Sequence, residues 1–302
     1  MAKKSSRHSS VRRGYQILGF ILLAPALISY IVFMGYPLYK TFWLSVQNWS
    51  GFGDAVFTGL QNFKMVMSDA TFWFSLKNTL YFAFFSAVFS IVLGVLMAWL
   101  NLYLGRFEGQ VFRTIMFIPN MISPTITGLL FMFIFTEDVG LLNNFLELIG
   151  LSHLTTAWLS NTATVKQVIV IATVWRQFGL TMILCYAGLQ GIPNELVESA
   201  RLDGAGEISI FTRVLLPLVK PQIEIATMFT MLGGLRIYDS VVSLTAGGPA
   251  RQTVVLPMWI IENAFTYSKF GYAGSMCVMF LLVVLIFIAI IRFLFRGEKY
   301  EY

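Results

Sequence analysis

The residues with the most specific types and spacing lie in segment 190–221. Asn194 can cap a helix, and Glu195 and Glu198 follow in its first turn, where the positive helix end favours carboxylates. The helix breaks at Asp203-Gly204, and a second short segment covers Glu207–Leu216. We expect a helix–turn–helix whose small residues at the bend let another protein approach closely. On composition alone, a simple amphipathic connector is an equal alternative.

Two arginines lie inside long apolar stretches, Arg176 and Arg236. Ionisable residues in hydrocarbon are costly and therefore indicate function. A structural pair between Arg236 and Asp239 on one helix face is an equal alternative. The neighbouring Gly233-Gly234 removes side-chain volume, which makes room either for a bulky ligand or for close helix packing.

Constellations for catalysis or nucleotide binding are missing from the sequence. There is no Gly-Lys pair and hence no P-loop, and no strand precedes Gly204-x-Gly206. His8 and His153 lie far apart, and Cys185 and Cys277 lie in apolar segments as small buried residues. We expect no enzyme, no metal site and no cofactor on this chain.

The composition indicates a membrane protein, because 57% of the residues are hydrophobic and only 12% are charged. A soluble domain carries about twice that charged fraction. A spanning helix needs about 20 mostly apolar residues. Six stretches qualify: Tyr15–Pro37, Leu80–Tyr103, Ile115–Phe135, Val168–Leu189, Ile223–Leu244 and Ala273–Phe295. The fold class is therefore all-α, with six transmembrane helices over residues 15–296 between a basic tail 1–14 and a tail 297–302.

The first apolar stretch follows basic residues but is longer than the apolar core of a signal peptide, and it lacks a clear cleavage site, so we interpret it as an uncleaved anchor. The Lys and Arg residues in the loops are distributed unevenly, and this bias predicts that both termini lie in the cytoplasm. Thirteen basic residues fall on the cytoplasmic side: Lys3, Lys4, Arg7, Arg12, Arg13, Arg106, Arg113, Arg201, Arg213, Lys220, Arg292, Arg296 and Lys299. Six fall on the other: Lys40, Lys64, Lys77, Lys166, Arg251 and Lys269. The net charge of +6 is thus a topology signal, and we expect no nucleic-acid partner.

The connections between spans differ in character. Segment 190–221 is cytoplasmic by the charge rule and should lie along the membrane face. On the outer side, Leu141–Gly150 and Leu256–Tyr267 have the spacing of short interfacial helices. Pro119 and Pro124 interrupt the third span and predict a kink. Such a kink is typical of a helix that lines a pathway, and prolines in a purely structural span are the alternative.

Segment 190–221 resembles the EAA loop of permeases in binding-protein-dependent ATP-binding-cassette importers. The match runs over about twenty residues at fixed spacing, with Ser199 where the family usually has Ala. The resemblance implies a coupling helix that docks into an ATPase subunit. The implied coupling residues are Glu198, Ser199, Ala200, Asp203, Gly204 and Ala205, with Phe211, Leu216 and Pro217 holding the loop against the membrane domain.

A second segment, Thr245-Ala246-Gly247-Gly248-Pro249 with Thr253, is similar to the TxGGP segment of carbohydrate permeases. It is typical of the first permease subunit in maltose, glycerol-phosphate and lactose importers. The resemblance covers nearly the whole chain and implies the type I importer permease fold. Substrate contacts carried over by alignment are Arg176, Gln177, Leu180, Thr230, Gly233, Gly234 and Ile237, and Arg236 is a further candidate.

The implied assembly holds a second, non-identical permease, two ATPases that bind ATP and Mg, and an extracytoplasmic solute-binding protein, all at a bacterial or archaeal inner membrane. We expect import of a sugar or oligosaccharide by alternating access. A polyol or phosphate ester is the alternative solute. A channel or secondary transporter, or a membrane scaffold or sensor, is the alternative class.

Overall fold

A computed structural model describes residues 18–296 of the chain. The basic tail 1–14, the first residues of the first span and the tail 297–302 lie outside the described residues. The chain forms two compact units. Within the described residues, the first holds 18–68 and 263–279, and the second holds 69–262 and 280–296.

The first unit combines a long apolar helix with a small polar cap. Within the described residues, helical backbone runs from Leu18 through η1 (Ile31–Gly35) and α2 (Tyr36–Ser45). A short hairpin follows, in which β1 (Gln47–Asn48) pairs antiparallel with β2 (Val56–Phe57), and then α3 (Gln61–Ser68). The buried Asn62 amide donates to the carbonyls of Ser45 and Gln47, which fastens α3 to the hairpin. The sequence pattern did not predict the hairpin or α3.

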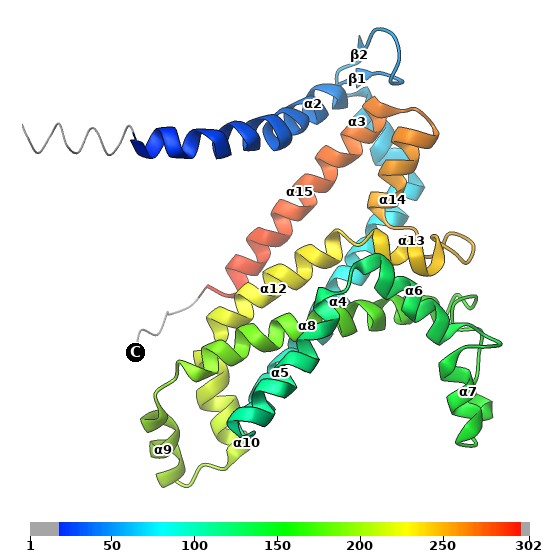
Figure 1. The fold of residues 1–302 in the computed structure, drawn as a ribbon. Coiled ribbons are helices and arrows are strands. Elements are labelled where there is room, and N and C mark those ends of the chain that lie inside the picture. The colour runs from blue at the N-terminus through cyan, green and yellow to red at the C-terminus, as the bar shows by residue number, and fades with distance from the viewer. Residues whose placement is uncertain (1–17, 297–302) are drawn as a thin grey trace, which may run out of the picture. The chain divides into compact units, whose positions relative to one another are not determined.

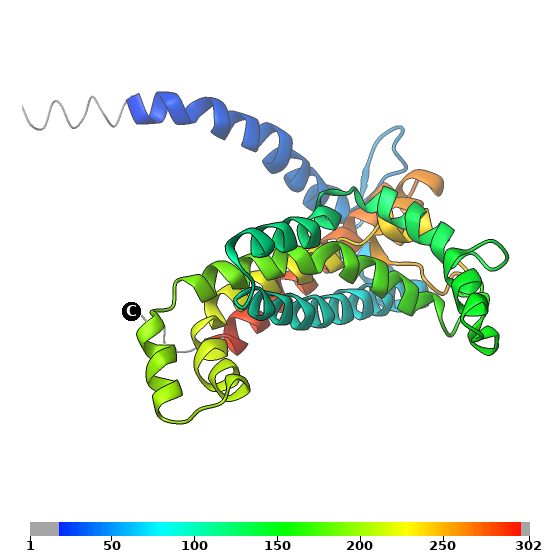
Figure 2. The ribbon, with the colours of Figure 1, turned by 60° about the horizontal axis from the view of Figure 1, so that its bottom comes forward.

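Three long helices form the centre of the second unit, as Figures 1 and 2 show: α4 (Ala70–Asn101), α8 (Val165–Gln190) and α12 (Lys220–Leu235). Their surfaces meet at small residues. A Cβ at Gly94 would lie 2.5 Å from the Cβ of Thr181, and one at Gly234 would lie 2.5 Å from the Cα of Ala83. Close backbone approach of this kind is how membrane helices gain packing energy without a hydrophobic driving force between them. It also shows that Gly234 serves helix packing.

The second span begins ten residues earlier than predicted, at Ala70 instead of Leu80. The polar residues Ser75, Lys77 and Asn78 obscured this end in the sequence. In the structure Ser75 and Asn78 are buried, and the Asp69 carboxylate caps the helix by accepting from the Thr71 amide at 2.8 Å. The fourth span, α8, starts three residues before the prediction and ends one residue after it.

The third span is two helices instead of one kinked helix. α5 (Arg106–Met121) and α6 (Pro124–Phe135) meet at an angle of 98°. Ser123 caps α6 by accepting from the Ile126 amide, and Pro124 occupies the first turn, where proline has no amide to lose. Instead of the predicted kink, α5 therefore ends at Met121 and a separate helix, α6, begins at Pro124.

The fifth span, predicted as Ile223–Leu244, is also interrupted. α12 ends at Leu235, and α13 (Asp239–Thr245) begins after three residues. The half-helices α6 and α13 then pack on each other, because a Cβ at Gly128 would overlap the Ser243 hydroxyl and Ser240 donates to the Pro124 carbonyl. The α5–α6 break and the α12–α13 break are therefore joined by contacts between α6 and α13.

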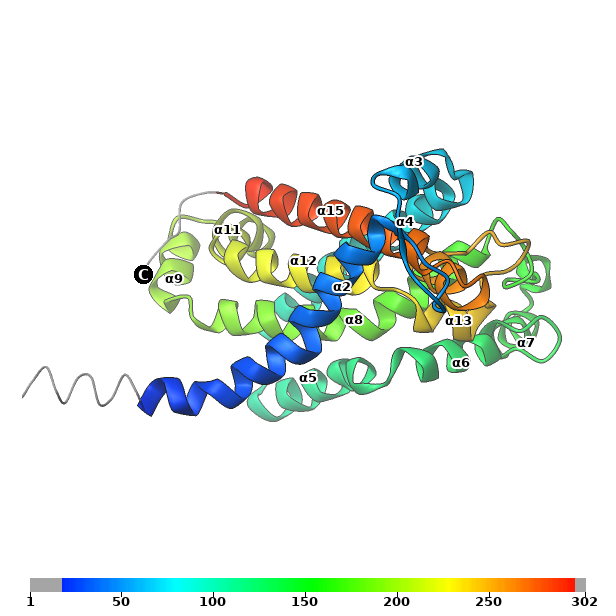
Figure 3. The same cartoon turned by 90° about the horizontal axis from the view of Figure 1, so that it is seen from above.

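Short helices connect the longer ones. α7 (Leu141–Leu148) and η2 (Ser152–Leu154) follow α6 in the second unit, where α14 (Leu256–Ile261) also lies. In the sequence, η4 (Glu262–Thr266) then leads into α15 (Phe270–Leu294), and residues 263–279 belong to the first unit. Helices thus form within both predicted interfacial segments. Figure 3 shows α9 (Asn194–Leu202), at the end of α8, on the opposite side of the unit from α7.

Four helices in the described residues are long and apolar enough to cross a membrane, and six spans result if each bent pair counts as one. The second bent pair joins Glu207–Leu218 to Lys220–Leu235, bent by 71°, and so differs in register from the predicted fifth span. The mostly helical, multi-span architecture is confirmed.

We predict that Gly234→Ala destabilises the protein. The added Cβ would press on backbone of Ala83, which cannot yield as a flexible side chain could, and overpacking of this kind costs about 1–3 kcal/mol. The thermal unfolding midpoint of the purified transporter should fall. Gly35→Ala is the control, since its Cβ meets nothing within 4 Å. Equal midpoints for the two variants would contradict this packing role.

Candidate functional site

The bend after α9 is a Schellman motif built on Gly204. The Gly204 amide donates to the Arg201 carbonyl and the Ala205 amide donates to the Ala200 carbonyl, each at 3.0 Å. Gly204 has a φ of +82°, in the left-handed region that glycine adopts at low cost. The glycine is therefore required by the turn itself, while its Cβ position is open, with nothing within 4 Å.

After the bend the chain returns to the membrane domain through α10 (Glu207–Ile210), η3 (Phe211–Leu215) and α11 (Leu216–Leu218). The Phe211 ring stacks on Trp99 at the end of α4, with centroids 4.5 Å apart. Ile210 and Leu215 are buried in a cluster with residues of α4 and α8, and Leu216 packs against it. Figure 2 shows α9 and the return segment at the ends of these helices. The bend is thus tied to the two central helices.

Polar contacts of Glu207 form a second connection between the loop and the end of α4. The sequence pattern did not single out this residue. Its carboxylate accepts from the Tyr103 hydroxyl at 2.6 Å and pairs with Arg201 at 2.9 Å. The Tyr103 hydrogen bond, followed by the Arg201 contacts, lowers the pKa of Glu207 despite its exposure. The pKa of Glu207 is therefore lower in the folded protein than in the unfolded chain. The contacts of its carboxylate stabilise the fold above the unfolded pKa, and this stabilisation is lost as the pH falls through the folded pKa.

The predicted coupling residues divide into an exposed and a packed group. Glu198, Ser199, Asp203, Gly204 and Pro217 are exposed. Ala200, Ala205, Phe211 and Leu216 are half-buried and pack against the cluster beneath the loop. Next to the exposed group, Leu202 is 89% exposed and Ile208 is 72% exposed. The loop therefore offers carboxylates, small residues and two free apolar side chains on the side away from the cluster.

Two of the predicted substrate residues, Gln177 and Gly233, meet where α8 faces α12. A Cβ at Gly233 would lie 2.9 Å from the Gln177 amide nitrogen, so glycine leaves room for that side chain. The Gln177 carbonyl oxygen and the Arg176 Nε are buried and have no hydrogen-bond partner in the described part of the chain. Asn120, beside the α5–α6 break, donates to the Arg176 carbonyl at 3.3 Å and brings the third span to the same place. Buried polar groups without partners are rare, and two of those in the described residues lie here on adjacent residues of α8.

Other candidates have structural surroundings. Thr230 is buried and donates to the Ala226 carbonyl within its own helix. Ile237 is 5% exposed and belongs to the apolar core with Val241. Leu180 is half-buried. Arg236 and Asp239 are both exposed, and no ion pair joins them in the described residues.

The segment after α13 is fastened by side chains of α4 and α14. Asn78 donates to the carbonyls of Gln252 and Val254, and the Thr79 hydroxyl accepts from the Leu256 amide. Thr245 and Thr253 share a hydrogen bond of 2.8 Å across the TxGGP segment. The sequence could suggest a turn here but not these partners, since they lie more than 170 residues away in the chain.

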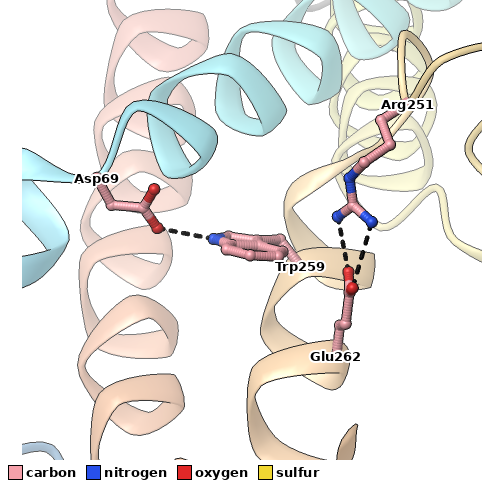
Figure 4. A network of polar contacts seen from close by, with 4 residues as sticks. All are labelled: Asp69, Arg251, Trp259 and Glu262. Atoms are coloured by element: carbon pink, nitrogen blue, oxygen red, sulfur yellow. Dashed lines mark hydrogen bonds and ion pairs between the residues drawn. The ribbon is translucent and has the colours of Figure 1, made fainter. Parts of the chain in front are cut away.

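Figure 4 shows further contacts that hold this segment. Arg251 pairs with Glu262 through two hydrogen bonds, of 3.2 and 2.7 Å, and lies over the Trp259 ring. The indole N–H of Trp259 donates to Asp69, the cap of α4, at 2.9 Å. The loop is therefore held at both α14 and the start of α4. Over residues 18–296, no group of three His, Cys, Asp or Glu residues could hold a metal ion.

The part of the chain that includes the α9 bend and the TxGGP segment matches a known protein family. Residues 90–298 match the family model described as binding-protein-dependent transport system inner membrane component. The lactose transport system permease protein LacF of Rhizobium radiobacter is 32% identical over 295 residues, covering 96% of each chain. The trehalose/maltose transport system permease protein MalF of Thermococcus litoralis is 32% identical over 273 residues, covering 89% of this chain and 90% of that protein.

A similar fold occurs in a solved bacterial alginate ABC transporter in complex with an alginate pentasaccharide-bound periplasmic protein. One chain of that structure superposes with a TM-score of 0.80 at 21% identity, covering 95% of this chain and 96% of its own length. The likeness confirms the ABC importer permease fold. Together with the family match and the several apolar spans, it leads to one conclusion. The chain belongs to the family of multi-pass inner membrane components of binding-protein-dependent transport systems.

Proposed function

We propose that this chain is a permease subunit of an ATP-driven importer of sugars or oligosaccharides. The observation that carries the proposal is near full-length similarity to permeases named for lactose and for trehalose/maltose transport. The subunit lines the translocation path and does not itself hydrolyse ATP, since the sequence has no P-loop.

The exposed face of α9 and the Schellman bend form the docking site for a separate ATPase. Glu198, Ser199, Asp203 and Gly204 face outward, while Ala200, Ala205, Phe211 and Leu216 secure the loop from behind. Displacement of α9 would therefore reach α4 through the Phe211–Trp99 stack and α8 through the buried cluster. This linkage is the physical basis we infer for alternating access, in which closure of two ATPases opens the spans outward.

The polar groups between α5, α8 and α12 form part of the solute pathway. Arg176 and Gln177 supply buried donors and an acceptor, which a hydroxyl-rich solute can satisfy, and Gly233 leaves space beside them. Thr230, Gly234 and Ile237 shape this region through packing. Arg236, exposed just after α12, is a further contact candidate.

The complete importer contains a second, non-identical permease, two ATPases carrying ATP and Mg, and an extracytoplasmic solute-binding protein. Both termini and segment 190–221 lie in the cytoplasm, by the distribution of Lys and Arg. The α7 and α14 segments then face the binding protein.

We predict that uptake of the sugar requires both ATP and the binding protein. The measurement is uptake of radiolabelled ligand of the partner binding protein into proteoliposomes that hold the assembled complex. Uptake should stop when ATP or the binding protein is omitted. Uptake driven by an ion gradient without ATP would identify a secondary transporter instead.

Leu202→Asp should abolish assembly with the ATPase. The side chain touches little of its own chain, so folding should persist, but a charge buried in an interface without a partner is costly. We expect at least a tenfold loss of ATPase recovered with the affinity-purified permease. Leu148→Asp is the matched control, because Leu148 is 83% exposed on α7 at the other side. Equal recovery from both variants would refute docking at α9.

Gly233→Ala should weaken solute handling without unfolding the protein. The new methyl group displaces the flexible end of Gln177 instead of backbone. The KM for uptake should rise by about two- to tenfold, the equivalent of one hydrogen bond, at an unchanged unfolding midpoint. An unchanged KM would show that Gln177 does not contact the solute.

A further inference from the structure

An apolar groove of about 600 Å³ runs between α4 and α8 on the second unit. On α4 it is lined by Tyr81, Phe85, Phe89 and Leu93, whose four-residue spacing places them on one helix face. Val174 and Phe178 are among the α8 residues on its other wall. Its lining is almost entirely apolar, which distinguishes it from the polar solute region. We refer to it as the α4–α8 groove.

The groove lies on a different face of α8 from the proposed solute contacts. Phe178 is two residues from both Arg176 and Leu180, which is about 200° of rotation on a helix, and one residue, about 100°, from Gln177. The groove therefore faces away from Arg176 and Leu180 and lies to the side of Gln177. Its apolar lining does not match the polar contacts that a sugar needs.

The length of the groove matches one leaflet of a bilayer. From Tyr81 to Leu93 a helix rises about 18 Å, and half of the hydrocarbon core is about 15 Å. A transmembrane helix from another subunit needs a seat along the whole core of about 30 Å. The groove is therefore matched in length to a single acyl chain.

Two lysines lie at the Tyr81 end of the groove. The Lys166 ammonium, at the start of α8, donates to the Asn78 side chain at 2.8 Å and lies 5.9 Å from the centre of the Tyr81 ring. Lys77 precedes Asn78 and lies one helical turn before Tyr81 on the same face of α4, where it is exposed. Neither lysine forms an ion pair with a carboxylate in the described residues. Two cations without a paired carboxylate, at one end of an apolar groove, complement an anionic headgroup.

We propose that the α4–α8 groove binds an anionic phospholipid, with one acyl chain along Phe85, Phe89 and Leu93 and the phosphate at Lys166 and Lys77. The Asn78 amide oxygen positions Lys166 for this contact while its amide nitrogen holds the loop at Val254. A bound headgroup would thus contact the helix end that fastens the TxGGP segment. The inference concerns lipid and holds whichever solute is imported.

The first test is lipid retention by the assembled transporter in native mass spectrometry. The complex is delipidated and titrated with phosphatidylglycerol or phosphatidylcholine. Phosphatidylglycerol should be retained preferentially, and Lys166→Gln and Lys77→Gln should each lower its affinity about fivefold. Lys64→Gln, on the exposed side of α3, should have no effect. Equal binding of the two lipids, or equal loss in all three variants, would overturn the proposal.

The second test locates the acyl chain of the bound lipid. Phosphatidylglycerol with a photoactivatable diazirine near its acyl end should label peptides that contain Leu93 and Phe178. Labelling should fall in Phe89→Trp, which fills the groove, while the transporter stays assembled. Labels spread evenly over all helices, or a cysteine at Phe85 that cross-links to the second permease, would show that a protein surface or bulk lipid occupies the groove.

Discussion

Hydrogen bonding of the backbone in hydrocarbon is the constraint on which the rest of this structure depends. An unpaired amide or carbonyl in the bilayer core costs several kcal/mol, so a membrane helix can be interrupted only where other groups replace the lost bonds. At the first interruption Ser123 caps α6 by accepting from the Ile126 amide, and at the second the Arg236 and Ile237 amides close the end of α12 by donating to the carbonyls of Leu232 and Gly234. Ser240 of α13 donates to the Pro124 carbonyl of α6 and so joins the two interruptions. Interrupted helices are costly to keep, and the buried polar groups of Arg176 and Gln177 lie beside them.

The same central helices serve both ends of the molecule's second unit. α4 carries Trp99 under the α9 bend at one end, while Asn78, Thr79 and the capping residue Asp69 hold the TxGGP segment and α14 at the other. A helix of 32 residues with contacts at both ends can transmit a displacement at α9 to the TxGGP segment. The proposed solute region lies between these ends on α8. The alternating access that we propose would use these contacts.

The sequence predicted the features that depend on local chemistry. Apolar length identified the spans, the Gly204 break identified the bend, and the motif spacing identified the family. It missed features that depend on distant partners: the early start of α4, where polar residues are buried, the complete break at Ser123, and the Tyr103–Glu207–Arg201 cluster. Gly233 and Gly234 illustrate the difference, since two adjacent identical residues face a flexible amide and a neighbouring backbone respectively.

The central claim is that α9 of this chain docks a separate ATPase, and site-directed cross-linking tests it most directly. Ser199→Cys is exposed on α9, and Asn144→Cys is an exposed control on α7, each in a chain whose native Cys185 and Cys277 are replaced by alanine. With a short bifunctional reagent in membranes, the account predicts that Cys at 199 joins the permease to a co-expressed ATPase subunit, with a yield that changes when nucleotide is bound. Cross-links from position 144 alone, or none from position 199 in a transport-active complex, would contradict it.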